Sequence, residues 1–405
     1  MRESVDIAVI GGGQAGLAAS HELTSRGAEH VVLERDRIAE TWRNRWDSFC
    51  LVLPNWSLRL PGHPYDGDDP DGFMPRDELV AYLERYAASF DAPVQESVEV
   101  TGLQPSPSGW TVETSNGALE ARAVIIATGA FQRTFHPPGW DSLPPSIVQV
   151  DIGGYHSPQS LPPGKVLVIG SGQSGCQIAE ELTLAGREVF LACGRSPWLP
   201  RRVGGRDIYW WATETGFMDT PLTALADPVE RLGANPQLSG HDGGHDMHFR
   251  TLDALGVTLL GHFTGADDLT AYFAPDLRAS IAFGDQAFQS FANLIRDYSE
   301  KRGISVDGLD PPPAWDHDGP ESLDLSGFGA VVVASGYRPD YRWMELPETL
   351  DPLGFPIQNA SGNGVLPGLH FLGVHFLRTR KSALLPGVGE DASVVVQRAV
   401  DHLGR

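Results

Sequence analysis

The residues best suited to chemistry in this chain lie in a glycine-rich segment near its start. Gly11, Gly13 and Gly16 have the spacing G-x-G-x-x-G, after an apolar run at residues 5–10 and before an Ala/Leu-rich stretch that ends near residue 26. This order predicts a strand, a tight turn and a helix. The free backbone N–H groups at the start of such a helix, together with its dipole, favour a bound phosphate. The segment therefore predicts a site for a dinucleotide.

Each glycine of this loop has a separate expected role. Gly11 permits the tight turn, Gly13 lets the backbone approach a pyrophosphate, and Gly16 allows close packing of helix on strand. Glu34 ends the next apolar run, at a spacing typical of an acid that binds a ribose diol, and it would repel a 2′-phosphate. We expect FAD or NAD here, and not NADP. Further candidate contacts for this first dinucleotide are Gln14, Ala15, Arg35, Trp42, Val100, Ala127, Thr128 and Gly129.

The same pattern returns 159 residues later. Residues 165–169 predict a strand, and Gly170, Gly172, Gln173, Ser174 and Gly175 form the second loop. The next strand ends in Cys-Gly-Arg, with no acid. Because a guanidinium can pair bidentately with a 2′-phosphate, Arg195 and Arg201 predict a preference for NADPH. Ser335 and Gly336 end a further buried run and complete the candidates for the second site.

The length of 405 residues suggests two or three domains. We predict an α/β fold with two Rossmann-like dinucleotide-binding domains, similar to glutathione reductase, the second inserted in the first. The expected division is residues 1–155 and 341–405 for the FAD-binding domain and 160–340 for the NADPH-binding domain. An insert at about 205–300 is interpreted as a substrate tunnel or a homodimer surface.

Composition argues against several classes of partner. The net charge of −22 disfavours nucleic acid and anionic membranes. No apolar run is long enough to span a bilayer, and the first strand begins too early for a signal peptide, so we expect a cytoplasmic protein. The three cysteines have neither C-x-x-C nor zinc-like spacing. His241, His245 and His248 share a Gly-rich loop without helical spacing, and we expect no metal site there.

Several longer fragments resemble the class B flavoprotein monooxygenases, which comprise the flavin-containing monooxygenases, the plant YUCCA-type enzymes and their bacterial relatives. The resemblance covers nearly the whole chain. It rests on GGGQAG, LER, TWRNRWDSF with LPNW and LPG, IIATG, HSPQSLPPGKVLVIGSGQSG, ASGYRPD, and FLG with GVGEDA. Of the family string F-x-G-x-x-x-H-x-x-x-aromatic, the chain keeps His156, while Val150, Ile152 and Ser160 occupy the other key places.

This resemblance implies a function. FAD would occupy the first site and NADPH the second. Reduced FAD would react with O2 to give a C4a-(hydro)peroxyflavin, which oxygenates an N, S or carbonyl centre of a small organic substrate. Asn55 would be the catalytic residue beside the flavin, and His156 would organise the domain linker. Asp391 starts the last predicted helix, either beside the flavin pyrimidine or simply as an N-terminal helix acid.

Three other interpretations share the scaffold or the cofactor. An NAD(P)H oxidase would release only peroxide, whereas a disulfide reductase needs a redox-active cysteine pair that the spacing does not supply. A non-catalytic redox sensor would have no need of a complete second site. The residue types do not name the substrate.

Overall fold

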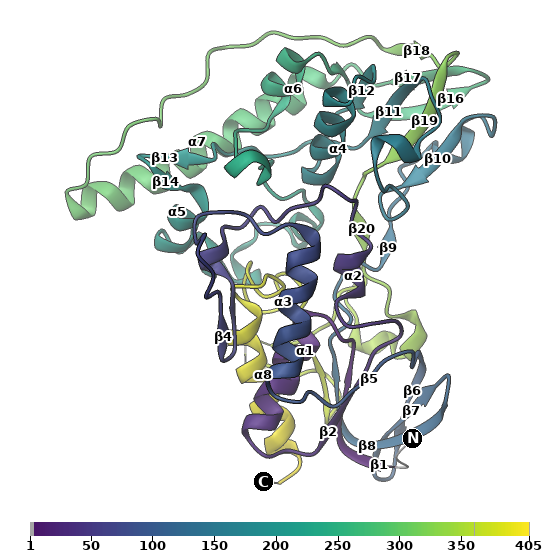
Figure 1. The fold of residues 1–405 in the computed structure, drawn as a ribbon, viewed down its shortest axis with the longest axis vertical. Helices are drawn as coiled ribbons and strands as arrows, with labels where there is room; N and C mark the ends of the chain where they lie inside the picture. Colours follow the sequence, from purple (N-terminus) through teal and green to yellow (C-terminus); the bar gives the residue numbers. More distant parts are fainter. Residues whose placement is uncertain (1–3, 360, 405) are drawn as a thin grey trace.

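The computed structural model describes residues 4–359 and 361–404. Figure 1 shows two lobes, each built on a parallel sheet, with several short elements between them. The chain leaves the first sheet after residue 126, builds the second, and returns to the first at residue 369.

The first sheet contains five parallel strands, ordered β5 (Val94–Gln95), β2 (His30–Leu33), β1 (Ser4–Ile10), β8 (Gly117–Ile126) and β21 (Leu369–Phe371). The long β8 also pairs antiparallel with β7 (Gly109–Thr114), which pairs with β6 (Val100–Ser106). Alternate side chains of β1 serve two cores, since Ile7 and Val9 face one layer while Ala8 and Ile10 face the other. The first layer contains α1 (Gln14–Ser25), α3 (Arg76–Ser89) and α8 (Val388–His402).

The second sheet is fully parallel, in the order β10 (Val148–Asp151), β19 (Phe328–Val333), β11 (Lys165–Ile169), β12 (Val189–Ala192) and β15 (Thr258–Leu260). One face packs on α4 (Gln173–Leu184) and α6 (Phe249–Leu255). The other packs on an antiparallel sheet of β16 (Phe263–Asp267), β17 (Thr270–Phe273) and β18 (Ser322–Asp324).

Pairing of β10 with β19 bears on the domain division. Residues 148–151 belong to the second sheet. We propose that the domain boundary lies between residues 127 and 147, earlier than the expected residue 155. We propose that the remaining division, with residues 341–405 returning to the first domain, describes the two dinucleotide-binding domains.

The remaining elements are short except for one helix. α2 (Glu40–Arg43) and the 3-10 turn η1 (Asn55–Ser57) follow β2, and β3 (Arg59–Leu60) pairs with β4 (His63–Pro64). In the insert, β13 (Arg202–Val203) pairs with β14 (Arg206–Asp207), then come α5 (Ile208–Glu214) and the 3-10 helix η6 (Pro228–Leu232). α7 (Leu277–Arg302) is the longest helix described. Leu277 and Ile281 extend its buried face into the core of the second sheet.

Among the described residues, no helix is both long and apolar enough to cross a bilayer.

His375 fastens the insert to the C-terminal segment and gives a pH-dependent prediction. Its Nε2 lies 2.9 Å from the Arg231 carbonyl in η6, and burial lowers its pKa from 6.5 to about 4. Below pH 6.5 the unfolded chain binds a proton that the folded ring still excludes. Stability is therefore lost as the pH falls from about 6.5 to about 4, by about 2 to 3 kcal/mol from this group.

The measurement is thermal unfolding of wild type and His375→Gln across this pH range. Glutamine can still donate to the carbonyl but does not titrate, so the variant should lose less stability on acidification. Parallel losses in the two proteins would rule out His375 as the source.

Candidate active site

The first glycine loop has the geometry of a phosphate-binding turn. Gly11 has a φ of +109°, and a Cβ added there would lie 2.8 Å from the Ala127 carbonyl oxygen. A Cβ on Gly16 would lie only 1.8 Å from the Gly11 oxygen, so α1 packs directly on the turn. Beside Gly13 the space is open, because a Cβ added there would meet no atom within 4 Å. The loop is thus closed toward the protein and open where a pyrophosphate would approach.

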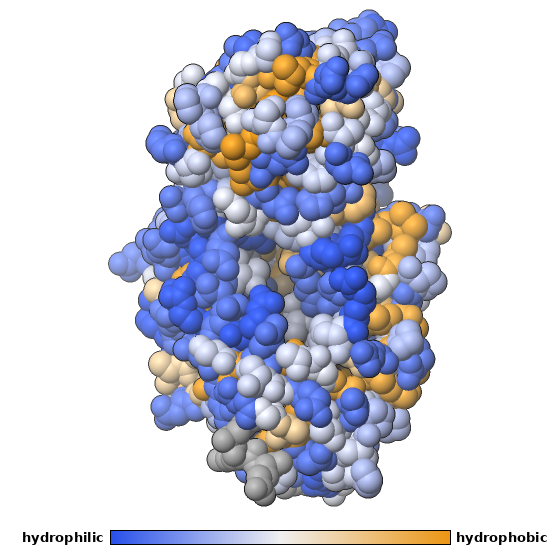
Figure 2. Space-filling model, turned by 90° about the vertical axis from the view of Figure 1, so that its right-hand side faces the viewer, coloured by the Kyte–Doolittle hydropathy of each residue, from blue (hydrophilic) through white to orange (hydrophobic). Residues whose placement is uncertain are grey.

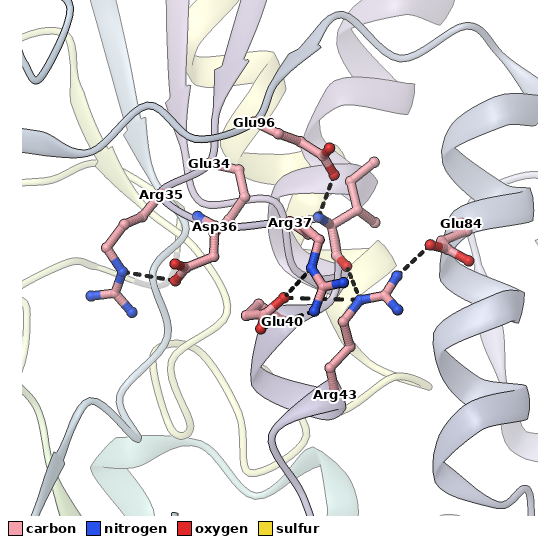
Figure 3. Close-up of polar contacts among 9 residues, drawn as sticks. Glu34, Arg35, Asp36, Arg37, Glu40, Arg43, Glu84 and Glu96 are labelled. Atoms are coloured by element: carbon pink, nitrogen blue, oxygen red, sulfur yellow. Dashed lines mark hydrogen bonds and ion pairs between the residues drawn. The ribbon is translucent and has the colours of Figure 1, made fainter.

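Glu34 lies beside this loop, as its spacing predicts. Its carboxylate accepts hydrogen bonds from the N–H of Gly12 at 2.5 Å and of Asp36 at 2.9 Å. Figure 3 shows the surrounding charged residues, in which Arg35 pairs with Asp36 and Arg37 with Glu40. The carboxylate is fixed by the backbone and remains partly exposed, which suits hydrogen bonding to a ribose diol.

Gln14 joins three segments that are distant in sequence. Its Oε1 accepts from Trp42 Nε1 at 2.8 Å, and its Nε2 donates to the Ala383 carbonyl at 3.2 Å. Trp42, on α2, is therefore held over the start of α1. The sequence patterns give no signal for the contact with Ala383, because it spans 369 positions.

The other candidates for the first site lie around the same edge of the sheet. Ala127 donates its N–H to the Ile10 carbonyl, and Gly129 accepts from the Tyr341 hydroxyl at 2.6 Å. Val100 begins β6. Two residues before it, the Val98 N–H donates to the Glu34 carbonyl. Ala15 lies within the first glycine loop and is buried. Thr128 directly follows Ala127.

The second glycine loop has the same close backbone contacts as the first. Gly170 has a φ of +106°, and its Cβ would lie 2.6 Å from the Ala334 oxygen, just after β19. A Cβ on Gly175 would lie 1.9 Å from the Gly170 oxygen, while that on Gly172 would meet only Ala234 at 3.8 Å. Gln173 and Ser174 start α4, and Ser335 and Gly336 follow Ala334. Two loops with the same close contacts and the same open position suit two dinucleotides.

The two loops differ at the end of the second strand. The position that corresponds to Glu34 is Cys193, because Leu33 and Ala192 pair with equivalent residues of β1 and β11. The next residue, Gly194, donates its N–H to the Ser171 hydroxyl at 2.9 Å. Arg195 is exposed, and no hydrogen bond or ion pair engages it in the described part of the chain. Its guanidinium is available to a phosphate.

The structure corrects the expectation for Arg201. This side chain is only 2% exposed, and its Nη2 pairs with Asp207 at 2.6 Å. Its Nη1 donates to the Val52 carbonyl at 2.9 Å, and burial lowers the pKa of the guanidinium. Because these donors are committed inside the protein, Arg201 fastens the insert to the first domain and does not face a 2′-phosphate.

Asn55 and Asp391 are both buried and both keep an oxygen without a hydrogen-bond partner. Asn55 Nδ2 donates to the Asp69 carbonyl at 2.9 Å, which leaves Oδ1 free. Asp391, in the first turn of α8, pairs with Arg378 at 2.9 Å, and burial raises the pKa of its carboxyl. Arg378 was not anticipated from the sequence, where it is only one member of the basic run RTRK.

The three histidines of the Gly-rich loop have separate structural contacts. His245 Nε2 lies 2.7 Å from Glu180, while His248 caps α6 and packs on Trp198. His241 starts a short 3-10 turn. Within the residues described, no group of three or more His, Cys, Asp or Glu side chains converges as metal ligands would.

The cysteines do not provide the pair that a disulfide reductase uses. All three are free and buried. Burial raises the pKa of Cys50 to about 11, and it also raises the pKa of Cys176 and of Cys193. A thiol with a raised pKa is a poor nucleophile near neutral pH.

His156 links the segments in a different way from that expected. Its side chain is exposed, and its carbonyl accepts from the Asp47 N–H at 2.8 Å. Nearby, Glu181 of α4 accepts from both Ser48 and Tyr155, each at 2.7 Å. Trp46, which is 1% exposed, packs into the core of the second sheet. The Trp-rich segment therefore connects the two lobes, and Figure 2 shows a hollow with a hydrophilic rim between them.

Comparisons with known proteins agree with this geometry. Residues 8–204 match the family model described as pyridine nucleotide-disulphide oxidoreductase. An uncharacterized CzcO-like oxidoreductase from Geobacillus kaustophilus is 31% identical, over 99% of this chain and 100% of its own length. The indole-3-pyruvate monooxygenase YUCCA1 from Oryza sativa is 34% identical, over 82% of this chain and 83% of its own. A flavin-containing monooxygenase from Stenotrophomonas maltophilia has the same fold, with a TM-score of 0.68, 21% identity, and coverage of 99% of this chain and 100% of that one.

The fold and the paired loops define a flavoprotein oxidoreductase with two dinucleotide sites. The chain belongs to the class B flavoprotein monooxygenase family, as its longer fragments indicate, and it is an enzyme. Membership implies FAD and NADPH as cofactors, and the residues present fit both. Each loop leaves its central glycine open. The second strand is followed directly by an acid in the first unit, and by an exposed arginine three residues on in the second.

Proposed function

We propose that the enzyme is an NADPH-dependent FAD monooxygenase that inserts one atom of O2 into a small organic substrate, at an N, S or carbonyl centre. The observation that carries this proposal is a contrast after the second strand of two otherwise matched units. The first unit has Glu34 there, whereas the second has Cys193, followed two residues later by the exposed Arg195. The first place repels a 2′-phosphate and the second attracts one.

The chain's own residues would bind and orient both cofactors. The loop at Gly13 and Glu34 would hold the FAD pyrophosphate and ribose, and the loop at Gly172 with Arg195 would hold NADPH. Bound FAD supplies the redox chemistry, because it accepts hydride from NADPH and, once reduced, activates O2. The second oxygen atom leaves as water.

Buried polar groups near the first site would assist this chemistry. The free Oδ1 of Asn55 offers one acceptor, and the neighbouring Trp56 packs on Tyr209 of α5 with ring centroids 5.8 Å apart. We propose that α5 and its neighbours cover the substrate site and exclude water. The positive end of the α8 dipole, next to Asp391, would favour negative charge on the flavin.

Product analysis tests the oxygenase assignment. The purified protein is supplied with NADPH and O2 and a panel of amines, sulfides and ketones. The proposal expects an oxygenated product from at least one class of substrate, with less peroxide formed when that substrate is present. Stoichiometric peroxide with every substrate would instead identify an NADPH oxidase.

Arg195→Ala tests the second site. The loss of a charge-assisted pair should cost about 1.5 to 3 kcal/mol, which raises the KM for NADPH about 10- to 150-fold. The KM for NADH should change little, because NADH lacks the 2′-phosphate. Arg302→Ala is the charge-matched control, since Arg302 ends α7 and stacks on Tyr298. Equal effects of Arg195→Ala on both nucleotides would refute the 2′-phosphate role.

A further inference from the structure

Two arginines face each other on the strands that carry the chain between the sheets. β9 (Arg133–Thr134) belongs to the outward crossing and β20 (Tyr337–Arg338) to the return. They pair antiparallel, side by side between the lobes, with Arg133 directly opposite Arg338 (Figure 1). Like charges directly opposite each other destabilise a strand pair. The ribbon therefore carries an unfavourable contact at the point where the lobes are joined.

No carboxylate in the described residues forms an ion pair with either arginine. The pKa of Asp340 is lowered by Arg342 first and, less, by Arg133, so this acid is near the pair without contacting it. The Arg133 side chain is exposed and makes no hydrogen bond or ion pair with any of the described residues. Arg338 donates from Nη1 to its neighbour's carbonyl, the oxygen of Tyr337, at 2.9 Å. The pKa of Arg338 is lowered by burial and then by Arg133. An arginine pair that forms no ion pair with a carboxylate is unexpected in a chain with 52 acidic residues.

The nearby acids are already committed to other partners. Asp340 pairs with Arg342 through both carboxylate oxygens, at 2.8 and 2.6 Å. Asp151 lies 2.7 Å from His136. The Asp340 charge is thus largely offset by Arg342, and one oxygen of Asp151 is occupied by His136. The two facing guanidiniums therefore keep donors for an outside anion.

The facing arginines line a concave site. Its volume is about 520 Å³, and its lining also includes Phe135, the Arg342–Asp340 pair and part of the segment 350–354. Arg338 lies over the Phe135 ring, 4.0 Å from its centroid, which orients the flat guanidinium. No residue of either glycine loop lines this site.

We propose that this site binds a small polyvalent oxyanion, bridged between Arg133 and Arg338, apart from both dinucleotide sites. Phosphate and carboxylate groups share the required chemistry, because each can accept two parallel N–H donors from a guanidinium. A bound anion removes the repulsion between the strands and fastens the two crossings together. Occupancy therefore stabilises one arrangement of the lobes.

The experiment uses the full chain with its flavin bound. Calorimetric titration and thermal unfolding are measured with inorganic phosphate and with citrate, against chloride at equal ionic strength. We expect saturable binding of at least one anion and a rise of several degrees in Tm. Phosphate alone would indicate a phosphate ligand, and citrate alone a carboxylate.

Variants of the two arginines predict the direction in which Tm changes. Without anion, the Tm of Arg133→Ala should be higher than that of wild type, because the substitution removes the repulsion. With saturating anion, its Tm should be lower than that of wild type. Its affinity for the anion should fall at least tenfold. Arg338→Lys serves as a second variant that keeps the charge but loses the planar fork. Arg342→Lys is the control within the site. It keeps a positive charge beside Asp340 and should keep most of the anion response.

Three outcomes would overturn the proposal. They are no saturable binding, an equal anion response in wild type and Arg133→Ala, and complete displacement of the anion by NADP⁺. The last would assign the arginines to the pyridine nucleotide site. None of these outcomes depends on oxygenase activity, so this test is separate from that of the proposed function.

Discussion

Replacing Gly13 with valine should give a folded protein that does not retain FAD. The residue has φ −82° and ψ −174°, which valine adopts readily, and a Cβ added there meets no atom of the protein within 4 Å. It would instead occupy the space through which the pyrophosphate approaches the backbone. We expect FAD affinity to fall at least about 100-fold, which is about 2.7 kcal/mol.

The measurement is FAD binding to the apoprotein, with circular dichroism as a check of folding. Gly153→Val is the matched control, because Gly153 also has open space around it and no positive φ, and it belongs to neither loop. It should bind FAD as wild type does. Tight FAD binding by Gly13→Val would show that the first loop does not hold the pyrophosphate.

Gly172→Val should produce the complementary defect, a yellow protein that NADPH reduces slowly. The residue again has an extended backbone, with φ −64° and ψ 179°, and its added Cβ would be in ordinary contact with Ala234. FAD binding should be retained because the first loop is unchanged. We expect the apparent affinity for NADPH to fall about 100-fold.

Anaerobic flavin bleaching measures this second effect, with dithionite as the control reductant. Dithionite should still bleach the variant fully, since it needs no nucleotide site. Bleaching by NADPH at the wild-type rate and concentration dependence would contradict the placement of NADPH at Gly172.

Local patterns predicted the parts of the molecule that depend on neighbouring residues. The helical spacing of the apolar residues in 76–89 predicts a helix, which is α3. The Asn116–Gly117 dipeptide predicts a hairpin turn, which joins β7 to β8. Both glycine loops and the approach of Glu34 to the first loop follow from fixed spacings, because the strand-turn-helix unit has little geometric freedom.

Contacts between distant segments could not be predicted in this way. Arg201 resembled a phosphate ligand by its place after the second strand, yet its guanidinium meets the Val52 carbonyl, 149 positions away. Likewise, β10 joined the second sheet because it pairs with β19. The opposition of Arg133 and Arg338 depends on a strand register that neither segment encodes alone.

The central claim is that two unlike dinucleotide sites pass reducing equivalents from NADPH to FAD. Anaerobic mixing of the purified, FAD-loaded enzyme with NADPH or NADH, followed by the loss of flavin absorbance, tests it most directly. We predict that NADPH bleaches the flavin at least about tenfold more efficiently than NADH, as the loss of one charge-assisted pair requires. Equal efficiency with the two nucleotides, or a protein that cannot be loaded with FAD, would contradict it.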